Sequence, residues 1–310
     1  MPDPAAVSSS DNPHAATHAA AASTQRTAWR QFSCDRMAML GACVLLLFVI
    51  GVAVGPFLYT ADYSTLDYSQ ANLLPSFQHP FGTNDRGQDQ LARMLWGGRV
   101  SIAVGITAML VSISLGTLIG TIAGFCGGFI DNVLMRLTDL FLSLPQLPLL
   151  LLIIYLFRDT MRSLAGPELG IFLLIILVIG GLTWMSTARL VRAGFLATKE
   201  REFVQAAESL GARPTRIVWR HILPNVIGPV IVAATLGVGN AIITESTLSF
   251  LGIGFPPDVP TWGRMLFDAQ NYIQSAPHLV IFPGLAIFLT VLSVNYVGDG
   301  LRDSLDVRSR

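Results

Sequence analysis

The chain has 310 residues, of which 52% are hydrophobic and only 13% charged, and its formal net charge is zero. This composition excludes an ordinary soluble domain and predicts an integral membrane protein. Because the net charge is zero, nothing in the total indicates a nucleic-acid partner, and only the distribution of charge along the chain is informative.

The first segment, residues 1–30, is predicted to be a disordered tail. Residues 1–25 are rich in Ala, Ser, His, Pro and Thr and carry almost no large apolar side chains. They cannot bury enough surface to offset the entropy of becoming ordered. His14 and His18 have the spacing of a helical metal pair, but no further ligands accompany them, so we expect no metal site.

Residues 31–310 are predicted to form one transmembrane domain. The first uncharged run is long enough to cross a bilayer, which takes about 20 residues. It is too long for a signal-peptide core and lacks a small-residue cleavage site, so we expect it to be retained as an anchor. The sequence therefore predicts an all-α membrane protein with six spans. These spans cover about 37–60, 100–126, 134–157, 169–190, 226–253 and 277–300.

Glycines and prolines mark features within these spans. Gly116, Gly120 and Gly124 repeat every four residues in the second span, which predicts close helix packing, more readily inside one subunit than at a seam between subunits. Pro145 and Pro148 are predicted to kink the third span near its start. A short loop is expected over residues 158–168.

The polar segment 202–225 predicts a short helix, a turn and a second helix. Phe203, Ala206, Ala207 and Leu210 fall on one face of the first helix, and Gly211 is expected to end it. The second helix is expected to start near Thr215 and to stop at Leu223 and Pro224. An ordinary amphipathic helix lying on the membrane surface is the alternative interpretation.

Glu245 is the one carboxylate placed well inside an apolar run, the fifth span. Carboxylates there are costly enough to suggest a function, and the first interpretation is that Glu245 lines or gates a translocation path. The second is a buried glutamate that is protonated or paired with the hydroxyls of Thr244, Ser246 or Thr247. The sequence leaves both open.

No residue pattern indicates catalysis or a cofactor. The only lysine, Lys199, follows a threonine, so the chain has no G-x-x-x-x-G-K-[ST] phosphate loop. Cys34, Cys43 and Cys126 are widely spaced and form no disulfide or metal pattern. We therefore expect neither enzymatic activity nor a bound metal or cofactor.

The segment 202–225 resembles the EAA loop of ATP-binding-cassette importer permeases. That signature reads E-A-A, three residues, G, nine residues, I-x-L-P, and the chain matches its spacing with Gln205-Ala206-Ala207, Gly211 and His221-Ile222-Leu223-Pro224. Gln205 stands where the family has Glu, and His221 where it has Ile. By this resemblance, the residues expected to couple to an ATPase are Phe203, Gln205, Ala206, Ala207, Leu210, Gly211, His221, Leu223 and Pro224.

Three more segments resemble the oligopeptide, dipeptide and nickel branch of these permeases. Residues 79–89 are similar to its motif H-x-F-G-T-D-x-x-G-R-D, with Asn84 and Gln88 in place of an acid and an arginine. Residues 256–266 are similar to the loop before the last span, and residues 295–306 to the ending of that branch.

The resemblance implies a permease subunit that forms half of a translocation pore for dipeptides or oligopeptides, in a bacterial cytoplasmic (inner) membrane. Nickel chelates and glutathione-like ligands are alternative substrates. The implied partners are a homologous second permease, two cytoplasmic ATP-binding subunits that hydrolyse ATP, and an extracytoplasmic solute-binding protein, besides membrane lipid. An ion-gradient-driven secondary transporter, and a structural anchor, remain as alternatives from other classes.

Charge asymmetry predicts the orientation independently of the motif. With both termini in the cytoplasm, fourteen cations fall on the cytoplasmic side and six on the other, as the positive-inside rule requires. This places the segment 202–225 in the cytoplasm. The six cations on the opposite side are Arg86, Arg93, Arg99, Arg158, Arg162 and Arg264.

Overall fold

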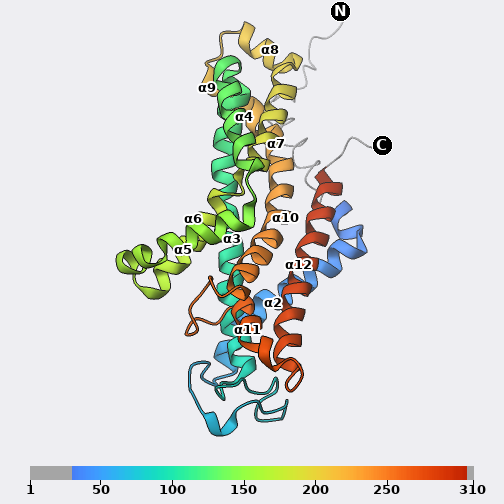
Figure 1. The fold of residues 1–310 in the computed structure, drawn as a ribbon. Helices are drawn as coiled ribbons and strands as arrows, with labels where there is room; N and C mark the ends of the chain where they lie inside the picture. Colours follow the sequence, from blue (N-terminus) through green and yellow to red (C-terminus); the bar gives the residue numbers. More distant parts are fainter. Residues whose placement is uncertain (1–29, 306–310) are drawn as a thin grey trace, which may run out of the picture.

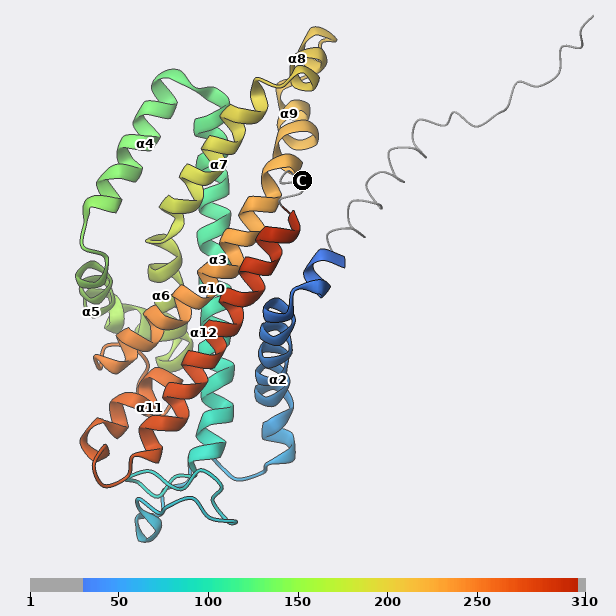
Figure 2. The same cartoon turned by 90° about the vertical axis from the view of Figure 1, so that its right-hand side faces the viewer.

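The structure, a computed structural model, describes residues 30–305, and that range is helical with one isolated β-bridge between Thr83 and Asp89. The remaining parts of the predicted tail, with His14 and His18, lie outside it. Figures 1 and 2 show the long helices running side by side along the molecule. These are α2 (Arg36–Leu58), α3 (Gln90–Cys126), α10 (Leu223–Phe250) and α12 (His278–Leu305).

Shorter helices complete the fold. They are α4 (Gly128–Ser143), α5 (Gln146–Ala165), α6 (Pro167–Gly181), α7 (Trp184–Lys199), α8 (Glu202–Ser209), α9 (Pro214–Ile217) and α11 (Trp262–Ala269), with the single turns η1 (Tyr68–Gln70), η2 (Val218–Ile222) and η3 (Gln270–Tyr272).

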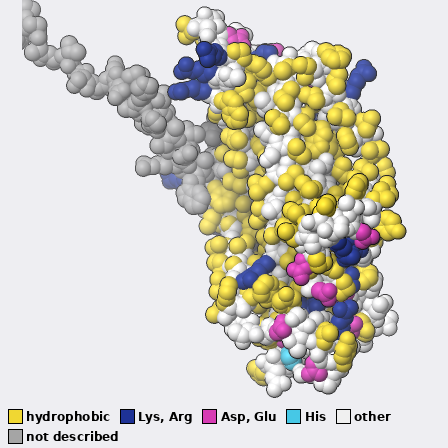
Figure 3. Space-filling model, turned by 90° about the vertical axis from the view of Figure 1, so that its left-hand side faces the viewer, with side chains coloured by type: hydrophobic (Ala, Val, Ile, Leu, Met, Phe, Trp, Pro, Cys, Tyr) yellow, Lys and Arg dark blue, Asp and Glu magenta, His cyan; other side chains and the backbone are white. Residues whose placement is uncertain are grey.

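The predicted fold class is confirmed within the described range. Four helices are long and apolar enough to cross a membrane, and the pairs α4–α5 and α6–α7, bent by 89° and 41°, raise the number to six if each pair is one span. Hydrophobic side chains cover most of the upper and middle part of the face in Figure 3, whereas mixed charges gather in its lower half. This surface fits lipid around the middle of the molecule and water at its ends.

The helices differ in extent from the predicted spans. The helix that contains the predicted second span starts at Gln90, before residue 100, because the Asp89 carboxylate accepts a hydrogen bond from the Ala92 N–H (2.8 Å) and caps the helix. No loop separates residues 158–168, since α5 continues to Ala165 and Gly166 turns the chain at φ 85° directly into α6. The last helix continues past residue 300 to Leu305.

The prolines of the third span act differently from one another. The 89° bend lies at Leu144 and Pro145, so the predicted kink is a complete break between α4 and α5. Pro148 lies in the first turn of α5, where a helix needs no N–H from it, and it causes no second kink. The break between α6 and α7, at Leu182 and Thr183, has no such signal in the sequence.

The glycine repeat lies against α7 of the same subunit. A Cβ atom added at Gly116, Gly120 or Gly124 would stand 2.6 Å from Thr187 Cβ, 2.5 Å from the Ala188 carbonyl oxygen and 2.6 Å from Phe195 Cβ respectively. The two helix backbones approach this closely because the three glycines present no side chain.

Two polar side chains of α3 satisfy carbonyl groups that prolines leave without a partner. A proline inside a helix has no N–H for the carbonyl four residues earlier. Pro56 thereby frees the Val52 carbonyl, which accepts from Arg99 Nε (2.6 Å). Pro283 frees the Leu279 carbonyl, which accepts from Gln90 Nε2 (3.3 Å).

The bond between Arg99 and Val52 can be tested by a double-mutant cycle. Arg99→Gln is expected to lower the free energy of unfolding by about 1–3 kcal/mol, because a buried carbonyl loses its charged donor. In a Pro56→Ala background the new N–H at position 56 donates to the Val52 carbonyl, so Arg99→Gln should lower the free energy of unfolding by less. Denaturant unfolding of the four variants in mild detergent measures the coupling. Equal costs in both backgrounds would contradict the assignment, since the contacts of Arg99 with Phe57 and Trp96 cancel in the cycle.

Residues 59–89 form a compact polar module at the end of the molecule opposite α8 (Figure 1). The buried Asp89 carboxylate accepts from the Tyr59 hydroxyl (2.7 Å) and lies 2.8 Å from His79 Nδ1. Burial, together with this carboxylate, raises the pKa of the Tyr59 phenol above its usual value. Asn84 and Gln88, which replace a charged pair of the similar motif, hydrogen-bond to each other (2.9 Å) as a neutral pair.

Candidate functional site

The coupling candidate, α8, has one buried side chain, Val204. Val204 is fully buried, while Phe203, Gln205, Ala206 and Leu210 are exposed. Ala207 is half-buried. The face predicted from the sequence is therefore largely free, at one end of the molecule (Figure 2). Val204 packs in a cluster with Val191, Phe195, Ile217, Val218, Ile222, Val226 and Val230.

Gly211 ends α8 by its backbone conformation. Its φ is 77°, and a Cβ atom there would meet nothing within 4 Å, so conformation rather than close packing requires glycine. The Gly211 N–H donates to the Glu208 carbonyl (2.9 Å) and the Ala212 N–H to the Ala207 carbonyl (3.0 Å). This pair of bonds is the Schellman motif, which fixes the direction in which the chain leaves the helix.

The predicted stop at Leu223 and Pro224 is wrong. The helix continues without a break for 37 residues from Pro214 to Phe250. A π-helical turn, η2, absorbs the proline: the Leu223 N–H reaches back to the Val218 carbonyl, and Asn225 Nδ2 donates to the His221 carbonyl (2.7 Å). Leu223 is half-buried and Pro224 exposed. His221 lies beside Phe203, with ring centroids 6.5 Å apart.

The same continuous helix forms one wall of a cavity of about 590 Å³. Asn240 and Thr244 face the cavity from α10, and side chains of α3, α4, α5 and α7, with the α6–α7 break, complete its lining. One helix thus joins the loop at the end of the molecule to the cavity. The lining residues are Met109, Ser112, Leu142, Gln146, Leu182, Thr183, Met185, Ser186, Thr187, Leu190, Ala233, Leu236, Gly237, Asn240, Ala241, Ile243 and Thr244.

Glu245 does not line this cavity and is completely buried. Its carboxyl oxygens accept hydrogen bonds from the hydroxyls of Ser249 (2.8 Å) and Ser101 (3.2 Å), the latter on α3. The hydroxyls of Thr244 and Thr247 instead donate to carbonyls of their own helix. This burial among hydroxyls supports the second sequence interpretation, although with different partners, and a role in the path stays a prediction.

Two substitutions at Glu245 separate the interpretations. Glu245→Gln keeps the shape, and its carboxamide can accept from one serine hydroxyl and donate to the oxygen of the other, so we expect a folded protein with transport near the wild-type rate. Glu245→Leu leaves Ser101 and Ser249 without a buried acceptor and should lower the free energy of unfolding by about 1–3 kcal/mol per hydroxyl. Transport in proteoliposomes and melting in detergent measure the two effects. A stable Glu245→Gln protein that no longer transports would instead support the path.

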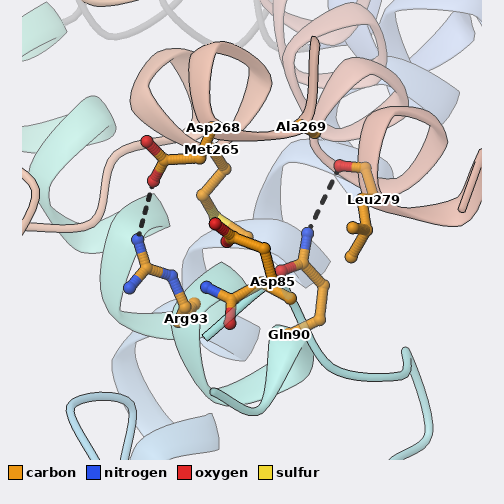
Figure 4. Close-up of a pocket in the computed structure, with 8 residues that line it drawn as sticks. Asp85, Gln90, Arg93, Met265, Asp268, Ala269 and Leu279 are labelled. Carbon is orange, nitrogen blue, oxygen red and sulfur yellow. Dashed lines mark hydrogen bonds and ion pairs between the residues drawn. The ribbon is translucent and has the colours of Figure 1, made fainter. Parts of the chain in front are cut away.

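A second cluster of charge surrounds Arg93 near the polar module (Figure 4). Arg93 is 2% exposed and lies 3.4 Å from Asp268, whose other oxygen lies 2.9 Å from Arg264. The space between Arg93, Asp85 and Gln90 is about 10 Å³, room for roughly one water molecule. These residues therefore hold α3 to α11 and leave no room for a substrate.

Sequence reasoning missed Val204, Ser101 and Arg93. Val204 stands on the side of α8 opposite Ala206, which could have marked it as the anchor of that helix. Ser101 and Arg93 gave no such signal, because their partners lie far away along the chain.

Comparison with known proteins gives close relatives over nearly the whole chain. The dipeptide transport system permease protein DppC of Alkalihalophilus pseudofirmus is 37% identical over 94% of this chain and 92% of that protein. The oligopeptide transport system permease protein OppC of Haemophilus influenzae is 36% identical over 91% of this chain and 88% of that protein. The glutathione transport system permease protein GsiD of Pectobacterium atrosepticum is 35% identical over 91% of this chain and 90% of that protein.

A solved structure shares the fold. An inward-facing conformation of the MetNI methionine ABC transporter matches with a TM-score of 0.55 at 16% identity, over 69% of this chain and 96% of that chain. Residues 23–76 match the N-terminal transmembrane domain of oligopeptide transport permease C. Residues 116–310 match the binding-protein-dependent transport system inner membrane component. The resemblance seen in the sequence is thus confirmed, and the chain belongs to this family of inner membrane permease components.

Proposed function

We propose that the chain forms half of the membrane pore of an ATP-driven importer for dipeptides or oligopeptides. The observation that carries the proposal is the continuous helix from Pro214 to Phe250, which links an exposed loop at one end to a cavity with both polar and apolar lining further along. A displacement of α8 would reach the cavity wall with little loss, because an unbroken helix transmits motion as a rigid rod.

The exposed face of α8 docks on an ATP-binding subunit. Small side chains at Ala206 and Ala207 allow close approach, in the way that a helix lies in a groove of its partner. Closure of two ATP-binding subunits then moves α8 and switches the cavity between the two sides of the membrane. The chain contributes no phosphate loop of its own, so ATP hydrolysis belongs to the partner.

The orientation and the other partners follow from the same proposal. Loop 202–225 and both termini lie in the cytoplasm, on the side with fourteen of the twenty cations. A homologous second permease completes the pore, and a solute-binding protein delivers peptide to the polar module on the other side. Among substrates, peptides are supported by the names of the dipeptide and oligopeptide relatives, and glutathione, itself a tripeptide, by the third.

Purification from native membranes in mild detergent tests the proposal. We expect a second permease and two phosphate-loop ATPases to accompany the chain, and reconstituted complex to take up peptide only with ATP and the binding protein. Peptide uptake driven by an ion gradient with the chain alone would establish the secondary transporter instead. A chain that copurifies with ATPases but takes up no peptide would keep the pore assignment and overturn the substrate.

A further inference from the structure

The cavity carries no ionisable group. Its lining, taken from the described residues, consists of apolar side chains, hydroxyls and two carboxamides, without Asp, Glu, Lys, Arg or His. Charged side chains lie at both ends of the molecule, so their absence from the cavity lining is a specific feature of the cavity. A single charge within a few ångströms of a passing ligand would favour one sign of charge over the other. The uncharged cavity wall therefore favours neither positively nor negatively charged ligands.

Several polar groups in the cavity have no partner. The carboxamides of Gln146 and Asn240 and the hydroxyl of Ser186 make no hydrogen bond within the part of the chain that the structure describes. Ser112 is fully buried and its hydroxyl is also unpaired. By contrast, the Thr183 and Thr244 hydroxyls donate to carbonyls of nearby helix turns. Gln146, Ser186 and Asn240 are exposed, so their polar groups are open to water or to a ligand in the cavity, whereas Ser112 is the buried group among these that lacks a partner.

The chemistry of the unpaired groups matches a peptide backbone. A carboxamide has both donors and acceptors, as a peptide group has, and can pair with either the N–H or the C=O of a peptide. Asn240 projects from α10, Gln146 is the first residue of α5 at the 89° bend, and Ser186 lies on α7. Three elements therefore present such groups to one space, whose volume of about 590 Å³ is in the usual range for small ligands.

We propose that Gln146, Ser186 and Asn240 hold the backbone of the transported peptide, and that this cavity passes acidic, neutral and basic side chains alike. The proposal rests on the proposed function, because it assigns the path of that same importer. Selection for side-chain charge then occurs before the peptide reaches the cavity.

A negative charge introduced into the cavity wall tests the proposal that the cavity passes side chains of either charge alike. The complete transporter, with its binding protein, is reconstituted in vesicles, and uptake of Ala-Asp, Ala-Ala and Ala-Lys is measured for the wild type and for Asn240→Asp. Dividing each variant rate by the wild-type rate for the same peptide removes the preference of the binding protein. We expect the corrected ratio of Ala-Lys to Ala-Asp to rise at least about tenfold, because aspartate repels the acidic cargo at short range.

Asn271→Asp is the matched control. Asn271 lies in η3, is exposed and is not part of the cavity, so the same chemical change there should leave the corrected ratio near one. If Asn240→Asp gives the same ratio as Asn271→Asp, or slows all three peptides equally, the cavity proposal is overturned. If the wild type transports none of the three peptides, the proposed function itself fails.

Discussion

An aspartate in place of Ala206 is expected to abolish transport while the permease stays folded in the membrane. Ala206 is exposed, so its own subunit tolerates the charge. On docking, however, the carboxylate would be buried against the ATP-binding subunit without a partner. That typically costs about 2–5 kcal/mol, which weakens binding by at least about thirtyfold. Copurification of the ATPase and peptide-dependent ATP hydrolysis should fall together.

The structure also selects the variants that make this test clear. Ala207→Asp should have the same effect, but Ala207 is half-buried and the substitution also perturbs the permease itself. Gly211→Asp adds strain, because φ is 77° there. Arg213→Asp is the matched control, since Arg213 is exposed and precedes α9, where aspartate is a favourable N-cap. Normal transport by Ala206→Asp with its ATPases bound would restore the surface-helix interpretation.

The glycine repeat of α3 gives the second large effect. Gly120→Ala would place a methyl group 2.5 Å from the Ala188 carbonyl oxygen and 2.8 Å from Val191 Cβ, so the backbones of α3 and α7 must separate. Overpacking of this kind costs about 1–3 kcal/mol, more than the helix propensity that alanine gains. We expect a lower melting temperature in detergent, and almost no folded protein for Gly120→Leu.

Gly51→Ala provides the comparison within another span. A Cβ atom at Gly51, in α2, meets nothing within 4 Å, so this substitution should be neutral or slightly stabilising. If Gly120→Ala melted at the same temperature as Gly51→Ala, close packing of α3 on α7 would not contribute to stability.

Helix ends that depend only on neighbouring residues could be predicted from the sequence. Gly211 ends α8 as expected, because a left-handed residue there needs no knowledge of the rest of the protein. The effect of Pro224 was not predictable, since it depends on whether the nearby carbonyls find other donors, and here a π-helical turn and Asn225 supply them. Pro145 indicated a kink, but its 89° angle also reflects the packing of α5 on α6 and on the loop that carries Phe255.

The candidate site divides in the same way. The free face of α8 could be read from helical spacing, whereas the environment of Glu245 could not, because Ser101 comes from a helix 144 residues earlier. The cavity was missed altogether, since its polar residues stand among apolar ones and come from helices far apart in the sequence.

The order in which the chain is synthesised gives a further role to Arg99 and Gln90, the two side chains of α3 that donate to carbonyls left unpaired by prolines. Helix α2 leaves the ribosome first, and until Arg99 follows, the Val52 carbonyl beside Pro56 has no donor. An unpaired carbonyl in hydrocarbon costs several kcal/mol, so α2 and α3 together form the smallest unit expected to remain inserted. For α12 the order is reversed, because Gln90 is already part of α3 when the turn before Pro283 is synthesised. Helix α12 is therefore synthesised after its donor, Gln90, whereas α2 is synthesised before its donor, Arg99.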